Sequence, residues 1–156
     1  MIKVAVCGAM GKMGREVVKA IFEDKETELV AAIDKFEEGK DIGTLVLGKS
    51  ENIIINSNIE ETLKSAKPDV VIDFTQPSYI FENAKLYIKN GVKPVIGTTG
   101  LKPDQIEELR KLSKENKVSC LIAPNFSTGA VLMMKFAKEA AKYFNNAEII
   151  ELHHNQ

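Results

Sequence analysis

The segment IKVAVCGAMGKMG, residues 2–14, joins an apolar, β-rich run to three glycines at positions 8, 11 and 14. We expect a strand over residues 2–7 and a helix over residues 12–23, with the glycines around the turn between them. Glycines at this junction let the backbone turn tightly and approach a pyrophosphate, whose charge the first amides and the dipole of the helix stabilise. The spacing G-x-x-G-x-x-G is a variant of the usual dinucleotide-binding pattern, and a purely structural glycine turn is the alternative.

An acidic residue follows at the distance that a dinucleotide site requires. Asp34 lies 20 residues after Gly14 and ends a second predicted strand, residues 29–34. A carboxylate there accepts hydrogen bonds from both adenosine ribose hydroxyls, so the glycine loop and Asp34 together predict dinucleotide binding. Asp34 favours NADH because it would face a 2′-phosphate, whereas the neighbouring Lys35 would neutralise that phosphate. The choice between NADH and NADPH stays open, and a solvated surface lysine is the alternative for Lys35.

Short β-rich runs alternate with helical patterns along most of the chain. The predicted strands are residues 2–7, 29–34, 53–55, 70–74, 95–96 and 118–122. The predicted helices are residues 12–23, 59–65, 79–89, 103–115 and 130–144, with a loop over residues 35–52 and a last strand over residues 147–154. This alternation predicts an α/β fold with a doubly wound parallel sheet.

Length and composition limit the classes of protein that fit. The 156 residues suffice for one α/β domain and are too few for two full ones. A net charge of −1, without a basic block, argues against nucleic-acid binding. No apolar run approaches the roughly 18 residues of a membrane helix and the first residues lack a secretory-signal pattern, so we expect a cytoplasmic protein without membrane contact. Cys7 and Cys120 lie in apolar runs and are expected to be reduced core thiols.

Three later loops are rich in small residues, hydroxyls and amides: residues 73–77, 97–100 and 123–129. Each follows a predicted strand, and the carboxyl ends of parallel strands share the edge of the sheet at which ligands bind. A turn with capping duties is the alternative for any single loop, but the convergence of all three favours a site for a nicotinamide and its ribose. Ser127 lacks a Gly-x-Ser-x-Gly context, so nucleophilic catalysis is not predicted.

His153 and His154, the two histidines of the sequence, are adjacent on the last predicted strand. Successive side chains of a strand point to opposite faces, so we do not expect both to bind one metal ion, and no metal site is predicted. Taken alone, such a pair is either incidental or catalytic, and the residues themselves leave this open.

The motifs GAMGKMG, DFTQP, GTTG, APNFSTG and ELHHNQ, in this order and spacing, resemble the dihydrodipicolinate reductase family. The family comprises NAD(P)H-dependent enzymes of the diaminopimelate route to lysine. The resemblance covers residues 2–156, and GTTG followed by NFS-x-G and E-x-HH is more specific than the glycine loop. It implies a Rossmann-like dinucleotide-binding domain over residues 1–126 and the beginning of a substrate-binding domain over residues 127–156.

The resemblance also implies a role for each matching position. The pyrophosphate would be held by Gly8, Ala9, Met10, Gly11, Lys12 and Met13, the adenosine ribose by Asp34, and a 2′-phosphate by Lys35. The nicotinamide side would be lined by Gly97, Thr98, Thr99, Ala123, Pro124, Asn125 and Phe126. His153 matches the family's general acid and His154 a substrate-carboxylate contact. The implied reaction is hydride transfer to a small cyclic dicarboxylate, 4-hydroxy-tetrahydrodipicolinate, with proton delivery to its ring.

The family pattern continues beyond this sequence. In the family, the histidine pair is followed by a catalytic lysine, a DAPSGT segment that binds substrate carboxylate, and the sheet from which the family's homotetramer is largely built. We therefore expect the chain to be the N-terminal part of such a reductase, with a cofactor site and incomplete catalysis. The alternatives are a non-catalytic module that binds a nicotinamide dinucleotide, and a different oxidoreductase of the same fold, which the lack of a thiolate at a loop or helix start disfavours.

Overall fold

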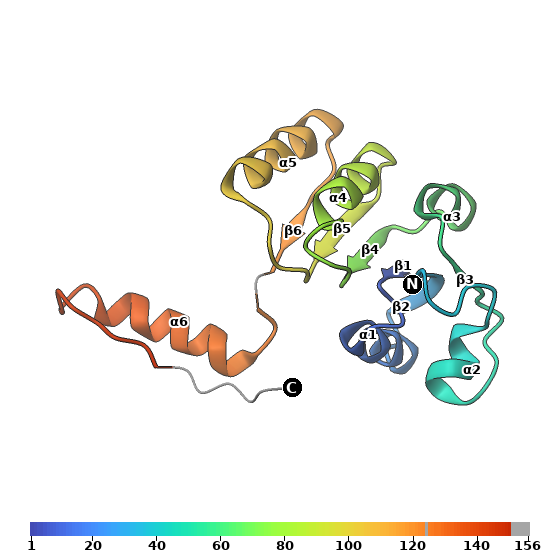
Figure 1. Ribbon diagram of the computed structural model, residues 1–156, viewed down its shortest axis with the longest axis horizontal. Coiled ribbons are helices and arrows are strands. Elements are labelled where there is room, and N and C mark those ends of the chain that lie inside the picture. The colour runs from blue at the N-terminus through green and yellow to red at the C-terminus, as the bar shows by residue number, and fades with distance from the viewer. Residues whose placement is uncertain (124, 151–156) are drawn as a thin grey trace. The chain divides into compact units, whose positions relative to one another are not determined.

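The computed structural model describes residues 1–123 and 125–150 (Figure 1). The chain divides into two compact units, Met1–Pro124 and Asn125–Gln156. The predicted domain boundary, between residues 126 and 127, falls two residues after this division. The sheet lies in the first unit, and the second unit contains the helix α6 (Thr128–Ala140).

The first unit is built on a six-stranded parallel sheet with the order β3-β2-β1-β4-β5-β6. The strands are β1 (Ile2–Cys7), β2 (Thr27–Ile33), β3 (Ile55–Asn56), β4 (Val70–Asp73), β5 (Lys93–Ile96) and β6 (Leu121–Ile122). The order changes direction between β1 and β4, so the carboxyl ends of these two strands flank the switch point at which open α/β sheets bind ligands. The predicted doubly wound parallel sheet is confirmed.

Helices cover both faces of the sheet (Figure 1). They are α1 (Lys12–Glu23), α2 (Ile42–Leu47), α3 (Ile59–Ala66), α4 (Ile80–Lys89) and α5 (Pro103–Asn116). Val4 and Val6 of β1 pack in the core cluster that includes residues of α1 and α2, whereas Ala5 and Cys7 pack in the cluster that includes residues of α3 and α4. Because β1 is buried on both faces from Val4 to Cys7, this part of its sequence is apolar without interruption. Within the described part of the chain, no helix has the length and apolarity needed to cross a membrane.

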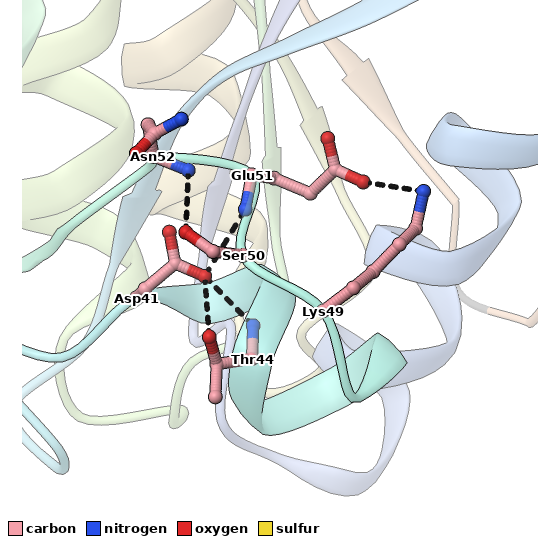
Figure 2. Close-up of polar contacts among 6 residues, drawn as sticks. All are labelled: Asp41, Thr44, Lys49, Ser50, Glu51 and Asn52. Carbon is pink, nitrogen blue, oxygen red and sulfur yellow. Dashed lines mark hydrogen bonds and ion pairs between the residues drawn. The ribbon is translucent and has the colours of Figure 1, made fainter.

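The segment between β2 and β3 contains a helix that the sequence analysis missed. Residues 35–52 are predicted as a loop, but Ile42–Leu47 form α2. The Asp41 carboxylate caps this helix by accepting from the Thr44 amide at 2.7 Å, and it also accepts from the Glu51 amide at 3.3 Å (Figure 2). These hydrogen bonds lower the pKa of Asp41, and the bond from the Thr44 amide has the largest effect. Six residues give too few repeats of apolar spacing for the helix to stand out from its charged flanks.

Two predicted strands are shifted because other contacts engage their first residues. The Val118 amide donates to the Ser113 carbonyl at 3.0 Å and so closes the end of α5, which makes β6 begin at Leu121. The Ile53 amide donates to the Asp41 carboxylate at 3.0 Å, so β3 begins at Ile55 rather than at residue 53. Strand pairing in β3 and β6 therefore begins beyond the residues that make these contacts.

The last predicted strand, residues 147–154, is wrong in its described part. Residues 147–150 form no strand, and residues 125–150 contain no other strand with which they would pair. A strand alone leaves its amides and carbonyls without partners, so the apolar alternation of this segment does not suffice. Residues 151–154 of that prediction lie outside the described residues. Helix α6 also begins two residues earlier and ends four residues earlier than predicted.

Candidate functional site

The loop between β1 and α1 is folded tightly by its own backbone. The Gly8 amide donates to the Ile33 carbonyl at 2.9 Å, and the Gly11 amide donates to the Gly8 carbonyl at 3.1 Å. Gly8 has φ of 79°, and a Cβ there would lie 2.6 Å from the Phe74 carbonyl oxygen. A Cβ at Gly14 would lie 2.0 Å from the Gly8 carbonyl oxygen. Packing alone therefore requires glycine at positions 8 and 14.

Gly11 differs from the other two glycines of the loop. It has an ordinary negative φ, and a Cβ there would meet just the Gly8 carbonyl oxygen, at 3.3 Å. Gly11 is also the exposed N-cap of α1, whose first turn carries no acidic side chain. The first amides of a helix point outward without helical acceptors, so this end of α1 suits a phosphate group. A side chain at Gly11 would be tight against the Gly8 carbonyl oxygen, but no other group of the described residues, its chain neighbours aside, lies within 4 Å of its Cβ position.

Asp34 links the glycine loop to the end of β2. Its Oδ2 accepts from the Met10 amide at 2.8 Å, and its Oδ1 accepts from the Phe36 amide at 3.0 Å. A carboxylate oxygen has about two acceptor positions, so each oxygen of Asp34 keeps one for a further donor. Asp34 is partly exposed, which allows a ligand to reach those positions.

A cavity of about 320 Å³ lies beside Asp34, at the carboxyl ends of β1, β2 and β4. It is lined by Cys7, Gly8, Gly11, Ile33, Asp34, Lys35, Phe36, Ser57, Ile59, Phe74, Thr75, Gln76, Tyr79 and Asn83. The exposed Lys35 places its ammonium nitrogen 4.2 Å from the centroid of the Tyr79 ring, a cation–π contact. The loop over residues 73–77, predicted as part of a site for the nicotinamide and its ribose, thus contributes Phe74, Thr75 and Gln76 to the same cavity as Asp34.

The predicted pyrophosphate residues divide into three groups. Gly8 and Gly11 line the cavity, whereas Ala9 is buried and Met10 packs against the core while its amide holds Asp34. The side chains of Lys12 and Met13 are exposed at the start of α1.

A second carboxylate, Asp73 at the end of β4, is completely buried. Its Oδ1 accepts from the Thr75 amide at 2.8 Å, the Thr75 hydroxyl at 2.6 Å and the Thr98 hydroxyl at 3.0 Å. Its Oδ2 accepts from the Tyr87 hydroxyl at 2.7 Å and the Asn83 side-chain amide at 3.3 Å. Asp73 belongs to a predicted ligand loop, residues 73–77, but its role as a buried acceptor was not predicted, because its donors lie up to 25 residues away along the chain.

The predicted nicotinamide-side residues Gly97, Thr98 and Thr99 follow β5 and do not line the cavity. A Cβ at Gly97 would lie 2.2 Å from the Phe74 ring, so this loop packs directly on the loop after β4. Thr98 is buried with its hydroxyl on Asp73, whereas Thr99 is exposed. Thr98 therefore fixes the loop rather than presenting its hydroxyl to a ligand.

Of the remaining predicted site residues, Ala123 belongs to the first unit and does not line the cavity. The Ala123 amide donates to the Ile96 carbonyl at 2.9 Å, next to the end of β6. Asn125 and Phe126 belong to the second unit, where the Asn125 side chain accepts from the Ser127 amide at 2.7 Å. Pro124, His153 and His154 lie outside the described residues.

The two cysteines are free and protonated. Burial raises the pKa of the Cys7 thiol strongly, and the Asp73 carboxylate adds to the effect. Burial also raises the pKa of the Cys120 thiol. Neither is a thiolate at neutral pH, which argues against thiol chemistry in this unit. Residues 1–123 and 125–150 contain no group of three or more His, Cys, Asp or Glu side chains suited to a metal ion.

Comparison with known proteins adds to this geometry. The family described as dihydrodipicolinate reductase, N-terminus, matches residues 2–126. The curated 4-hydroxy-tetrahydrodipicolinate reductases of Listeria welshimeri and Syntrophomonas wolfei are 49% and 51% identical to the chain over 154 residues. Each match covers 99% of this chain but 59% and 58% of the relative, so the chain spans well under two thirds of their length.

A solved structure agrees with these sequence matches. Dipicolinate-bound dihydrodipicolinate reductase from Paenisporosarcina sp. TG-14 superposes with a TM-score of 0.77 at 43% identity, over 92% of this chain and 55% of that one. The family match, the curated relatives and the fold agree: the chain belongs to the dihydrodipicolinate reductase family, of which it contains the N-terminal part.

Proposed function

We propose that the chain is the dinucleotide-binding part of a 4-hydroxy-tetrahydrodipicolinate reductase and binds NADH or NADPH at the cavity beside Asp34. The observation that carries this proposal is the pair of amide bonds on Asp34, 2.8 Å from Met10 and 3.0 Å from Phe36. They hold the carboxylate at the cavity and leave one acceptor position on each oxygen, as two ribose hydroxyls require.

The residues present fit a dinucleotide at both ends of this cavity. The space left at Gly11 and the first amides of α1 suit the pyrophosphate, and Asp34 suits the adenosine ribose. Lys35 stands beside Asp34 on the cavity wall, where its charge suits a 2′-phosphate. Both NADH and NADPH therefore remain within the proposal.

In the proposed reaction, the bound reduced nicotinamide supplies the hydride. The side of the site that receives the nicotinamide ring would be lined by Gly97, Thr98, Thr99, Ala123, Pro124, Asn125 and Phe126. His153, as an imidazolium, would deliver a proton to the substrate ring, and His154 would contact a substrate carboxylate. The histidine roles follow from the match of ELHH to the family pattern.

We also make proposals for the substrate and the oligomeric state of the whole protein. The curated relatives are named for reduction of 4-hydroxy-tetrahydrodipicolinate, and we propose the same small cyclic dicarboxylate for the whole protein. We further propose that residues 127–156 begin the substrate-binding domain and that the whole protein is a homotetramer. A cytoplasmic location and the absence of nucleic-acid and membrane partners stay predictions.

Replacing Asp34 with alanine tests the cofactor site. We expect Asp34→Ala to weaken NADH binding at least about tenfold, because hydrogen bonds to a charged group contribute roughly 1.5–3 kcal/mol each. The measurement is a fluorescence titration of NADH with the folded protein and the variant. Gly11→Val should weaken binding as well, by filling the space of the pyrophosphate.

Asp24→Ala is the matched control for Asp34→Ala. Asp24 precedes β2 at the opposite end of the strand and also accepts two local hydrogen bonds, from Glu26 and Thr27. We expect its NADH affinity to stay within twofold of the unchanged protein. Equal affinity of the Asp34→Ala variant and the unchanged protein would contradict the assignment of the ribose site.

Lys35→Ala tests the choice between the two cofactors. We expect NADPH to bind about tenfold more weakly, or ~1.4 kcal/mol, and NADH to change less than twofold, because the ammonium group gains mainly from the extra phosphate. Dissociation constants for both cofactors check this, with Lys25→Ala, at an exposed lysine near the other end of β2, as the control. Equal losses for NADH and NADPH would contradict a role specific to the 2′-phosphate, and unchanged affinity for both would leave Lys35 a solvated surface lysine.

Turnover separates the reductase from a non-catalytic module. We expect the 156-residue polypeptide to oxidise NADPH with enzymatically generated substrate at under one hundredth of the rate of a polypeptide continued through the segment that follows in the relatives. The physical reason is substrate positioning, which lowers reaction barriers by roughly 7–11 kcal/mol. Rates within tenfold of each other would contradict this expectation. NADH binding by both polypeptides without turnover by either would favour the non-catalytic module.

A further inference from the structure

Asp73 occupies a position that a carboxylate rarely takes. Its side chain is completely buried at the end of β4, beside the switch point of the sheet. Buried carboxylates are normally paired with a cation, because burial removes the water that stabilises their charge. No ion pair within residues 1–123 and 125–150 includes Asp73, which is surrounded by polar groups there. Within the described residues, Asp73 thus depends on neutral hydrogen-bond donors, next to the candidate cofactor site.

The donors to Asp73 come from three separate segments. Oδ1 binds the amide and hydroxyl of Thr75, after β4, and the hydroxyl of Thr98, after β5. Oδ2 binds Asn83 and Tyr87, both on α4. Burial, together with the neighbouring Cys7 and Asp73, raises the pKa of Tyr87 well above its usual value, so its hydroxyl stays protonated. One carboxylate therefore fastens two strand-end loops to each other and to a helix.

These tethered residues shape the wall of the cavity. Thr75 and Asn83 line it, and so does Phe74, whose ring packs on Gly97 of the neighbouring loop. A shift of either loop would therefore displace the other and change the cavity. Both oxygens of Asp73 accept hydrogen bonds, Oδ1 from three donors and Oδ2 from two. An asparagine there has a single acceptor oxygen and a nitrogen that is itself a donor, so it serves the donors of one oxygen at most.

We propose that Asp73 is a positioning residue, which holds the loops after β4 and β5 in the conformation that binds the nicotinamide dinucleotide. Its carboxylate does not contact the cofactor; it acts through Thr75 and Thr98. Loops that are already ordered before the cofactor binds lose less conformational freedom on binding. The contribution of Asp73 is therefore to the affinity for the cofactor. The inference rests on the proposed function, because it supposes that the cavity takes NADH or NADPH.

Asp73→Asn is the main test. The variant keeps the size of the side chain but loses acceptor capacity, and we expect at least tenfold weaker binding of NADH and NADPH alike. Val71→Ala is the matched control, because Val71 is also completely buried and lies on the same strand and face as Asp73. It should lower the melting temperature while the dissociation constant for NADH stays within twofold. All titrations are made well below each melting temperature.

A second pair of variants decides the matter if Asp73→Asn does not fold. Thr75→Ser keeps the hydroxyl that donates to Asp73, whereas Thr75→Val keeps the shape and loses that hydroxyl. We expect the serine variant to bind NADH at least fivefold more tightly than the valine variant.

If the unchanged protein binds NADH, three results would overturn the proposed role of Asp73 and leave the proposed function standing. They are unchanged affinity of folded Asp73→Asn, an equal loss of affinity in Val71→Ala, and equal affinities of the two Thr75 variants. Failure of the unchanged protein to bind either cofactor would instead overturn the proposed function, and this inference with it.

Discussion

The first loop passes so close to other backbone segments that positions 8 and 14 have no room for a side chain. A Cβ at Gly8 would lie 2.6 Å from the Phe74 carbonyl oxygen, and one at Gly14 would lie 2.0 Å from the Gly8 carbonyl oxygen. This close approach sets where α1 begins and brings the loops after β1 and β4 together at the switch point. Gly11, between these two positions, lines the cavity beside β2.

Two carboxylates at neighbouring strand ends have complementary tasks in this arrangement. Asp34 is partly exposed, binds the Met10 and Phe36 amides, and keeps acceptor positions for a ligand. Asp73 is completely buried, and its oxygens are engaged by the Thr75, Thr98, Asn83 and Tyr87 donors. In our account, Asp34 recognises the cofactor, and Asp73 keeps the surrounding loops in place for it.

Local patterns of the sequence sufficed for some of these features and not for others. The apolar run of β1, the glycines and Asp34 were predictable because strand, turn and acid follow one another within one βαβ unit. The short helix α2 was not predicted because six residues give too few repeats of apolar spacing to stand out from their charged flanks. The predicted strand over residues 147–154 failed in its described part because alternation does not supply a pairing partner. The buried hydrogen-bonding role of Asp73 was not predictable, because its donors converge only in the folded chain.

We propose, above all, that the carboxyl ends of β1, β2 and β4 form one dinucleotide site. Titration of the ¹⁵N-labelled protein with NADH, followed residue by residue through the backbone amide resonances, tests it most directly. We expect saturable shifts concentrated at residues 8–14, 34–36 and 74–76, with little change at residues 24–26 and 69, near the opposite ends of the strands. Saturable shifts confined to other parts of the sheet, or no shifts in a folded sample, would contradict it.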